Sequence, residues 1–167
     1  KAVSFHTLVE FYVMLQFSEA GVKPNKVVAA HKELSEAYTT AFPFALKEVL
    51  EGIRTDGRRI FFNLGENTLS LDGSKQLNLD FIKLFFRNLE FDADHLASKF
   101  WPLGKENSIV IDPERKLGHP VIADRNIFPE TLFDHYKAGD SVKFIASMYE
   151  LTEKQVKNAI EFVESAA

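Results

Sequence analysis

The chain has 167 residues, of which 46% are hydrophobic, and a formal net charge of −4. This length suits one domain or two small ones with a substantial core. The absence of cysteine excludes disulfides and cysteine-ligated metal sites. No apolar run reaches the roughly 18 residues of a membrane-spanning helix, so we expect no membrane span. The lack of cysteine fits a reducing cytoplasm, which is the expected location. The acidic balance gives no general support for nucleic-acid binding, which usually requires a basic surface.

The first 40 residues predict two helices. Apolar side chains occur on almost every side of residues 5–20, which predicts a buried helix. Gly21 stands where a helix-terminating glycine is expected. Pro24 suits the first position of a second helix, whose pattern fades near Tyr38.

The segment 41–111 predicts a small α+β domain with an antiparallel sheet. Alternating apolar residues indicate strands, and Gly-containing turns separate them. The expected elements are an ambiguous short helix at 45–53, strands at 59–64 and 68–71, a helix at 79–89, and strands at 97–101 and 108–111.

The segment 112–167 predicts a loop-rich joint, residues 112–128, followed by three helices that begin at Pro129. Asp140 or Ser141 is expected to cap the second helix. Thr152 and Gln155 have the spacing of a capping box at the third. The predicted fold class is therefore α+β and mainly helical. It has an amino-terminal helix pair (1–40), a central α+β segment (41–111) and a carboxy-terminal trihelical, helix-turn-helix-like domain (112–167).

Two groups of side chains are candidates for DNA contact. The last helix is expected to present polar residues that contact phosphates or base edges, namely Lys154, Gln155, Lys157 and Asn158. Its trihelical segment carries a net charge of −3, so a helical bundle with a solvated polar face is the alternative. A basic cluster before the predicted hairpin is either a phosphate contact or a solvated turn, and it comprises Arg54, Arg58 and Arg59.

Aromatic residues are the candidates for partner contact. Trp101 ends a predicted strand and is either an interface anchor or a core residue. Phe81 and Phe85 lie beside the main apolar stripe of the helix at 79–89, which predicts a homodimer or heteromeric surface there. The five histidines are scattered, with no metal-ligand spacing and no glycine-rich phosphate loop. We therefore expect no cofactor, no metal and no enzymatic activity.

The last third of the chain carries a recognisable pattern. It reads Gly118-His119-Pro120-Val121-Ile122, then Arg125 and Ile127, then Ala138-Gly139-Asp140-Ser141, Tyr149-Glu150-Leu151-Thr152, Val156 and Ala159-Ile160-Glu161-Phe162. This pattern resembles the domain of unknown function 433 family over roughly residues 108–165. Members of that family are often antitoxin components. The family usually has Gly-Thr-Arg after Pro-Val-Ile, whereas this chain has Ala123-Asp124-Arg125.

A second resemblance lies in the stretch HTLVEFYVMLQFSEAGVKPNKVVAAHKEL, which is similar to the two helices after the wing of MerR-type DNA-binding domains. The MerR-type helix-turn-helix would precede Lys1. Together the two resemblances imply an antitoxin of a type II toxin–antitoxin module. Its implied partners are a PIN-like nuclease toxin and the operator DNA of its own operon. The alternatives are a stand-alone DNA-binding regulator and a small-ligand-binding or enzymatic domain in the central part.

Overall fold

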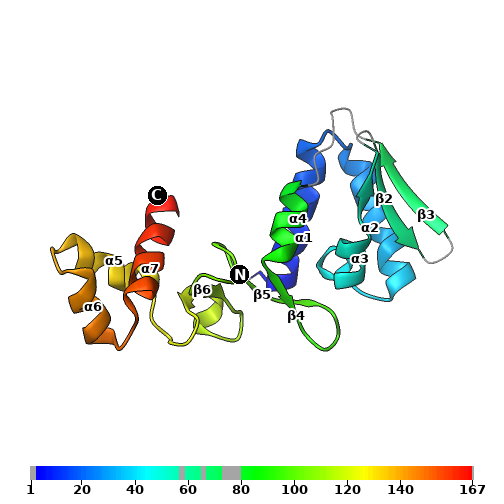
Figure 1. Cartoon of the computed structure of the whole chain (residues 1–167). Helices are drawn as coiled ribbons and strands as arrows, with labels where there is room; N and C mark the ends of the chain where they lie inside the picture. Colours follow the sequence, from blue (N-terminus) through cyan, green and yellow to red (C-terminus); the bar gives the residue numbers. More distant parts are fainter. Residues whose placement is uncertain (1–2, 57–58, 65–66, 73–79, 167) are drawn as a thin grey trace. The chain divides into compact units, whose positions relative to one another are not determined.

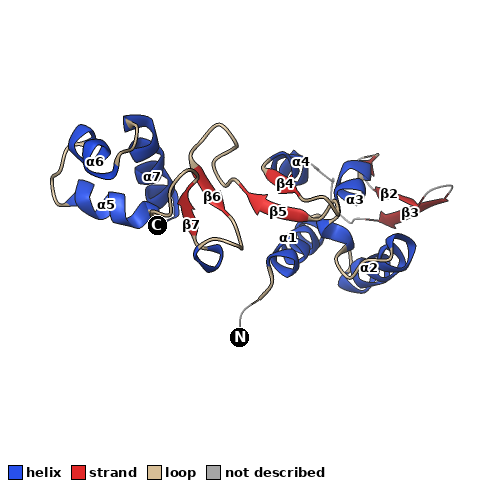
Figure 2. Cartoon of the chain, turned by 90° about the horizontal axis from the view of Figure 1, so that it is seen from below, coloured by secondary structure: helices blue, strands red, loops and turns tan. Residues whose placement is uncertain are grey.

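The computed structural model describes residues 3–56, 59–64, 67–72 and 80–166 (Figure 1). The chain divides into two compact units, Lys1–Ser98 and Lys99–Ala167. Helices predominate in both, alongside short antiparallel strands (Figure 2), so the α+β, mainly helical fold class is confirmed. In the described ranges, no helix combines the length and apolar character needed to cross a membrane.

The amino-terminal unit contains most of the elements that the sequence predicts. Ser4 caps the first helix by accepting a hydrogen bond from the backbone N–H of Thr7. Three-residue β4 and two-residue β1 were not predicted, because they are too short to show a period. The elements are α1 (Phe5–Glu19), α2 (Pro24–Tyr38), the 3-10 helix η1 (Pro43–Ala45), α3 (Lys47–Gly52), β1 (Arg54–Thr55), β2 (Arg59–Leu64), β3 (Asn67–Asp72), α4 (Asp80–Arg87), β4 (Leu89–Phe91) and the start of β5 (Ala97–Phe100).

An aromatic core joins the helices of this unit to its three-stranded sheet, whose order is β1-β2-β3. Phe17, Phe44 and Phe62 are each at most 1% exposed. Their ring centroids lie 5.5 to 5.9 Å apart, the range in which aromatic pairs attract each other. Residues from the first two expected segments, 1–40 and 41–111, thus share one core.

The expectation that α1 is buried on all sides is wrong. Leu8, Phe11 and Leu15 form a stripe on α1 in which each side chain is 54 to 60% exposed. The opposite side packs inward through Val9, Val13 and Phe17, among others. Apolar residues on every side of a helix therefore do not show which of its sides are buried and which are exposed.

The carboxy-terminal unit begins inside β5 and ends with three helices. The loop expected at 112–128 holds two short elements that the sequence did not predict, η2 and β7. Strand β7 pairs antiparallel with β6, with Ile109 opposite Ile122. The elements of this unit are β6 (Ile109–Ile111), η2 (Lys116–Gly118), β7 (Pro120–Ile122), α5 (Pro129–Lys137), α6 (Val142–Tyr149) and α7 (Glu153–Ala166).

Helices α5 and α7 pack against the β6–β7 pair, α6 packs against α5 and α7, and capped turns join the helices. Ser141 caps α6 by accepting a hydrogen bond from the backbone N–H of Phe144. The capping box at α7 is confirmed, because Thr152 Oγ1 accepts from Gln155 N at 3.2 Å and Gln155 Oε1 accepts from Thr152 N at 2.8 Å. The fully buried core residues of this unit include Ile109, Ile122, Leu132, Ile145, Val156 and Ala159.

Candidate functional site

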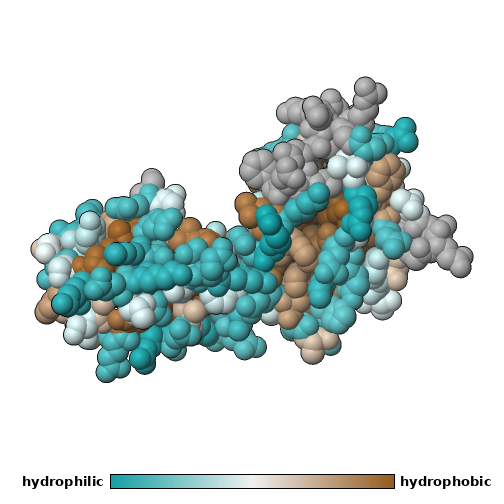
Figure 3. Space-filling view, in the orientation of Figure 1, coloured by the Kyte–Doolittle hydropathy of each residue, from teal (hydrophilic) through white to brown (hydrophobic). Residues whose placement is uncertain are grey.

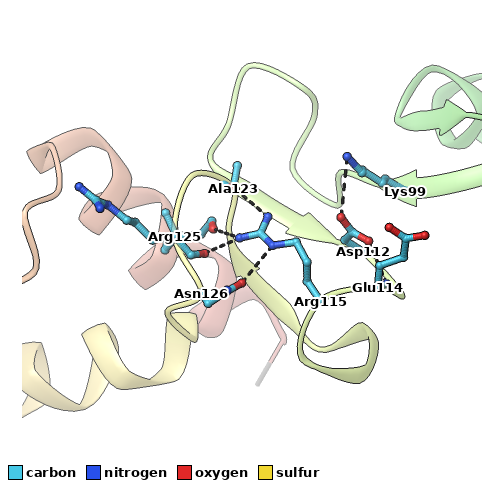
Figure 4. Close-up of polar contacts among 8 residues, drawn as sticks. Lys99, Asp112, Glu114, Arg115, Ala123, Arg125 and Asn126 are labelled. Carbon is cyan, nitrogen blue, oxygen red and sulfur yellow. Dashed lines mark hydrogen bonds and ion pairs between the residues drawn. The ribbon is translucent and has the colours of Figure 1, made fainter.

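The loop between β6 and β7 is organised by one side chain, Arg115 (Figure 4). Its guanidinium donates to the carbonyl oxygens of Ala123 at 2.6 Å, Arg125 at 2.7 Å and Ile122 at 3.2 Å. Its Nε donates to Asn126 Oδ1 at 3.0 Å. Four charge-assisted hydrogen bonds thus fix the segment after β7 to the segment before it. The sequence analysis missed Arg115, because no spacing rule assigns acceptors to a loop arginine.

The departure from the family's Gly-Thr-Arg is accommodated in this loop. Ala123 is not among the residues with positive φ, so its position does not require glycine. Its backbone N–H donates to Ser108 O at 2.8 Å, and its carbonyl accepts from Arg115. Arg125, the residue that matches the family's arginine, lies 3.5 Å from Glu150.

Buried Asp112 holds the first turn of the same loop. Its Oδ1 accepts from the backbone N–H of Glu114 at 3.0 Å, which makes an Asx-type turn. Its Oδ2 lies 3.7 Å from Lys99 Nζ (Figure 4). The entry to the loop is therefore held by a turn hydrogen bond and an ion pair.

A second polar network links α5 to α6 through His135. Its Nδ1 lies 2.8 Å from Asp140 Oδ2, and its Nε2 lies 2.9 Å from the Tyr149 hydroxyl. A neutral imidazole with its proton on Nδ1 donates to the carboxylate and accepts from the phenol, so both nitrogens are satisfied. Of the two residues expected to cap α6, Ser141 is the cap and Asp140 orients this histidine.

The outer face of α7 presents fewer polar groups than expected. Lys154 and Lys157 are exposed, although Lys154 Nζ donates to Glu106 O at 3.2 Å. Gln155 is half-buried and occupied by the capping box. Asn158, expected on this face, is only 6% exposed, because α7 packs against β6 as well as α5 and α6. Lys157 is therefore the candidate of this group that remains most available for a phosphate.

The arginine cluster near the hairpin is partly engaged within the amino-terminal unit. Arg54 donates to the carbonyls of Glu51 and Ile53 at the end of α3. The Nε atom of Arg59 lies 3.3 Å from an Asp72 carboxylate oxygen, and Lys26 approaches the same carboxylate. Arg58 lies outside the described residues. Arg54 and Arg59 therefore both have partners within their own unit.

The aromatic candidates occupy different environments. Phe85 is 9% exposed and stacks on Tyr12 with ring centroids 4.0 Å apart, so it packs inside the amino-terminal unit. The side chain of Phe81 lies outside the described part of α4. Trp101 is half-buried in the carboxy-terminal unit. The exposed apolar residues of the amino-terminal unit include the α1 stripe, Val28 on α2 and Leu84 on α4. Apolar patches are visible on this unit in Figure 3.

A small cavity of about 190 Å³ lies between α3 and α4. Its lining combines apolar side chains with charged ones at the rim: Leu50, Ile53, Ile82 and Phe86, together with Glu51, Arg54 and Lys83. Its volume is below the several hundred Å³ of typical ligand pockets. The cavity is a location for the ligand-binding alternative, but it is smaller than a typical ligand pocket.

Buried Glu10 is a further residue that the sequence analysis did not single out. It lies on the inner side of α1 and is 5% exposed. Its Oε1 accepts from Phe44 N at 2.6 Å, and its Oε2 lies 2.7 Å from His31 Nε2. Burial raises the pKa of Glu10 to about 7, although hydrogen bonds from the Phe44 and Ala45 backbones act in the opposite direction. Burial also lowers the pKa of His31. A Glu within an apolar helix carries no sequence signal of this role.

The carboxy-terminal pattern now has an independent match. Residues 109–163 match the family described as Protein of unknown function (DUF433). Residues 109–163 form a DUF433 domain. The domain covers β6, the Arg115 loop and β7, and it extends through α5 and α6 into α7. The resemblance drawn from the sequence is therefore confirmed for this part of the chain.

Similarity to known proteins also extends beyond the DUF433 domain. The chain is 22% identical over 173 residues to a protein named "Putative antitoxin VapB45" from Mycobacterium tuberculosis (strain ATCC 25618 / H37Rv). That match covers 95% of this chain and 70% of the relative. The crystal structure of Rv2018 from Mycobacterium tuberculosis superposes with a TM-score of 0.66 at 17% identity, covering 95% of this chain and 78% of that one. Its likeness shows a shared fold.

Proposed function

We propose that this protein is the antitoxin of a type II toxin–antitoxin module. In this role it binds and neutralises a PIN-like nuclease toxin in the cytoplasm, represses its own operon and has no enzymatic activity of its own. The observation that carries the proposal is the similarity to a protein named as an antitoxin over 95% of this chain. The DUF433 domain supports it, because members of that family are often antitoxin components.

The polar networks of the DUF433 domain are consistent with a binding protein. Arg115 and His135 both direct their hydrogen bonds to groups of their own domain. They fix loops and helix ends, which pre-organises a surface for a partner.

The first prediction follows from the toxin-binding role. Co-expression of this chain with the product of the adjacent gene is expected to give one co-eluting complex on size exclusion with light scattering, and the nuclease activity of that product is expected to fall. A nuclease from an unlinked locus serves as the control and is expected to elute separately. Separate elution of two folded proteins, with nuclease activity unchanged, would contradict the proposal.

The same light-scattering measurement tests a homodimer, which is part of the proposal. We assign its surface to the α1 stripe of Leu8, Phe11 and Leu15, which is flanked by exposed Ser4 and Ser18. A two-fold axis places the same patch against itself. Leu8, Phe11 and Leu15 carry no charge, and exposed Glu19 follows one turn after Leu15 at the end of the helix. A monomeric mass across a wide dilution range would exclude this dimer.

The second prediction concerns operator DNA. The double substitution Lys154→Ala and Lys157→Ala is expected to weaken binding to the DNA upstream of the gene. It should also reduce the slope of log K against log salt by up to about 2, because each phosphate contact contributes roughly 0.9. Fluorescence anisotropy at several salt concentrations measures both quantities. Lys137→Ala is the matched control, because this lysine lies over the Phe133 ring on α5. If the double variant has the same slope of log K against log salt as the native chain, these lysines of α7 do not contact the DNA.

A further inference from the structure

The tip of the Arg115 loop has a backbone that its residues do not favour. Lys116, Leu117 and Gly118 have φ values of 47°, 57° and 79°, all in the left-handed region. Glycine adopts this region freely, but lysine and leucine do so at a cost, because Cβ approaches the following carbonyl oxygen. Two consecutive non-glycine residues in this conformation make the tip an outlier within the DUF433 domain.

The leucine at the centre of the tip gains nothing from packing within its own unit. Leu117 is 95% exposed, more than any other large hydrophobic residue described. An exposed leucine on an unfavourable backbone lowers stability without a compensating contact. Such outliers persist where the surrounding structure holds them, and they concentrate at functional sites.

The surroundings hold this tip firmly. Gly118 N donates to Arg115 O at 3.0 Å, and His119 N donates to Lys116 O at 3.2 Å. The Arg115 side chain fixes the base through its four hydrogen bonds. The rings of His119 and Phe128 meet edge to face, and Lys116 Nζ lies 5.7 Å from the Phe128 ring centroid. Leu117 is therefore presented on a rigid support.

We propose that the tip Lys116-Leu117-Gly118 is a preformed anchor for the toxin, with the Leu117 side chain entering an apolar socket on that protein. This inference rests on the proposed antitoxin function and names the contact through which it acts. Exposed Lys116 beside the leucine favours a socket with a carboxylate at its edge. Because the loop is ordered beforehand, binding does not have to order it.

The test compares variants of Leu117 in binding to the purified product of the adjacent gene by calorimetry. Leu117→Asn is expected to weaken binding about tenfold to a hundredfold, the loss that corresponds to one leucine no longer buried. It is also expected to leave the midpoint of urea unfolding equal to or above that of the native chain, since asparagine tolerates the left-handed region better than leucine. Leu117→Met keeps an apolar side chain and should bind within a few-fold of the native chain.

Met148→Gln is the matched control, because Met148 is a 45% exposed apolar residue of α6 in the same unit. Its affinity is expected to be unchanged. Equal affinity of Leu117→Asn and the native chain would overturn the anchor while leaving the antitoxin proposal intact. An equal loss of toxin affinity in Leu117→Asn and Met148→Gln would also overturn the anchor. The same holds if Leu117→Asn dissociates a homodimer but leaves the toxin affinity unchanged. Failure of the native chain to bind would instead reject the proposed function, and the anchor with it.

Discussion

Replacement of Arg115 by methionine is expected to lower the free energy of unfolding of the carboxy-terminal unit by about 3 kcal/mol, because the loss of a charged donor leaves partly buried acceptors unsatisfied. The partly buried acceptors are the carbonyls of Ile122 and Ala123. The other two acceptors, the Arg125 carbonyl and the Asn126 side chain, are exposed. Arg115→Lys should lose most of the same stability, since an ammonium group cannot reach acceptors spread around a planar guanidinium.

Fluorescence during urea unfolding measures this loss of stability in the carboxy-terminal unit. The chain has a single tryptophan, Trp101, and it lies in the carboxy-terminal unit. Lys143→Met is the control, because it changes an exposed cation on α6 of the same unit and should alter stability by no more than about 0.5 kcal/mol. A loss below about 1 kcal/mol in Arg115→Met would mean that the loop holds its conformation without the arginine.

The parts of the fold that the sequence predicted well are those with a period or a local cap. Helices α2, α5 and α7 have an apolar stripe and a start signal, and β2 alternates over six residues. The capping box of Thr152 and Gln155 depends only on residues three apart, so it formed as expected. Strands β4 and β7 were not predicted, although β6, which also has three residues, was. Their pairing depends on distant partners.

The candidate site was less predictable, because its key contacts join residues through the fold. Asn158 lies on the side of α7 opposite its apolar stripe, yet β6 and the neighbouring helices leave it buried. Arg115 finds its acceptors 7 to 11 residues along the chain, across a loop. The left-handed tip at Leu117 is equally invisible in composition, since leucine does not favour that conformation.

The role of Glu10 in the amino-terminal unit was likewise not predictable from the sequence. Glu10 joins α1 to η1 and α2 through Phe44 and His31. Its pKa is raised from 4.5 to about 7, chiefly by burial. The folded state therefore binds a proton that the unfolded state releases between these two pH values. The stability that this group contributes is present below pH 4.5 and is lost as the pH rises through about 7. The lowered pKa of His31 acts in the opposite sense, with stability lost as the pH falls.

Glu10→Gln is accordingly expected to stabilise the amino-terminal unit at pH 8 by up to about 3 kcal/mol relative to the native chain, and to give little gain at pH 5. Glutamine keeps an acceptor for Phe44 N and a donor for neutral His31, but it carries no charge to bury. Urea unfolding followed by far-UV circular dichroism measures the effect, with the transition that is silent in Trp101 fluorescence assigned to this unit. Glu36→Gln is the control, because Glu36 lies exposed on α2, 3.9 Å from Lys32, and should show no such pH dependence. A gain from Glu10→Gln that is the same at pH 5 and pH 8 would mean that Glu10 does not titrate in this range. The carboxylate would then be held ionised by His31, and the pair would act as a buried ion pair that ties α1 to α2 at every pH tested.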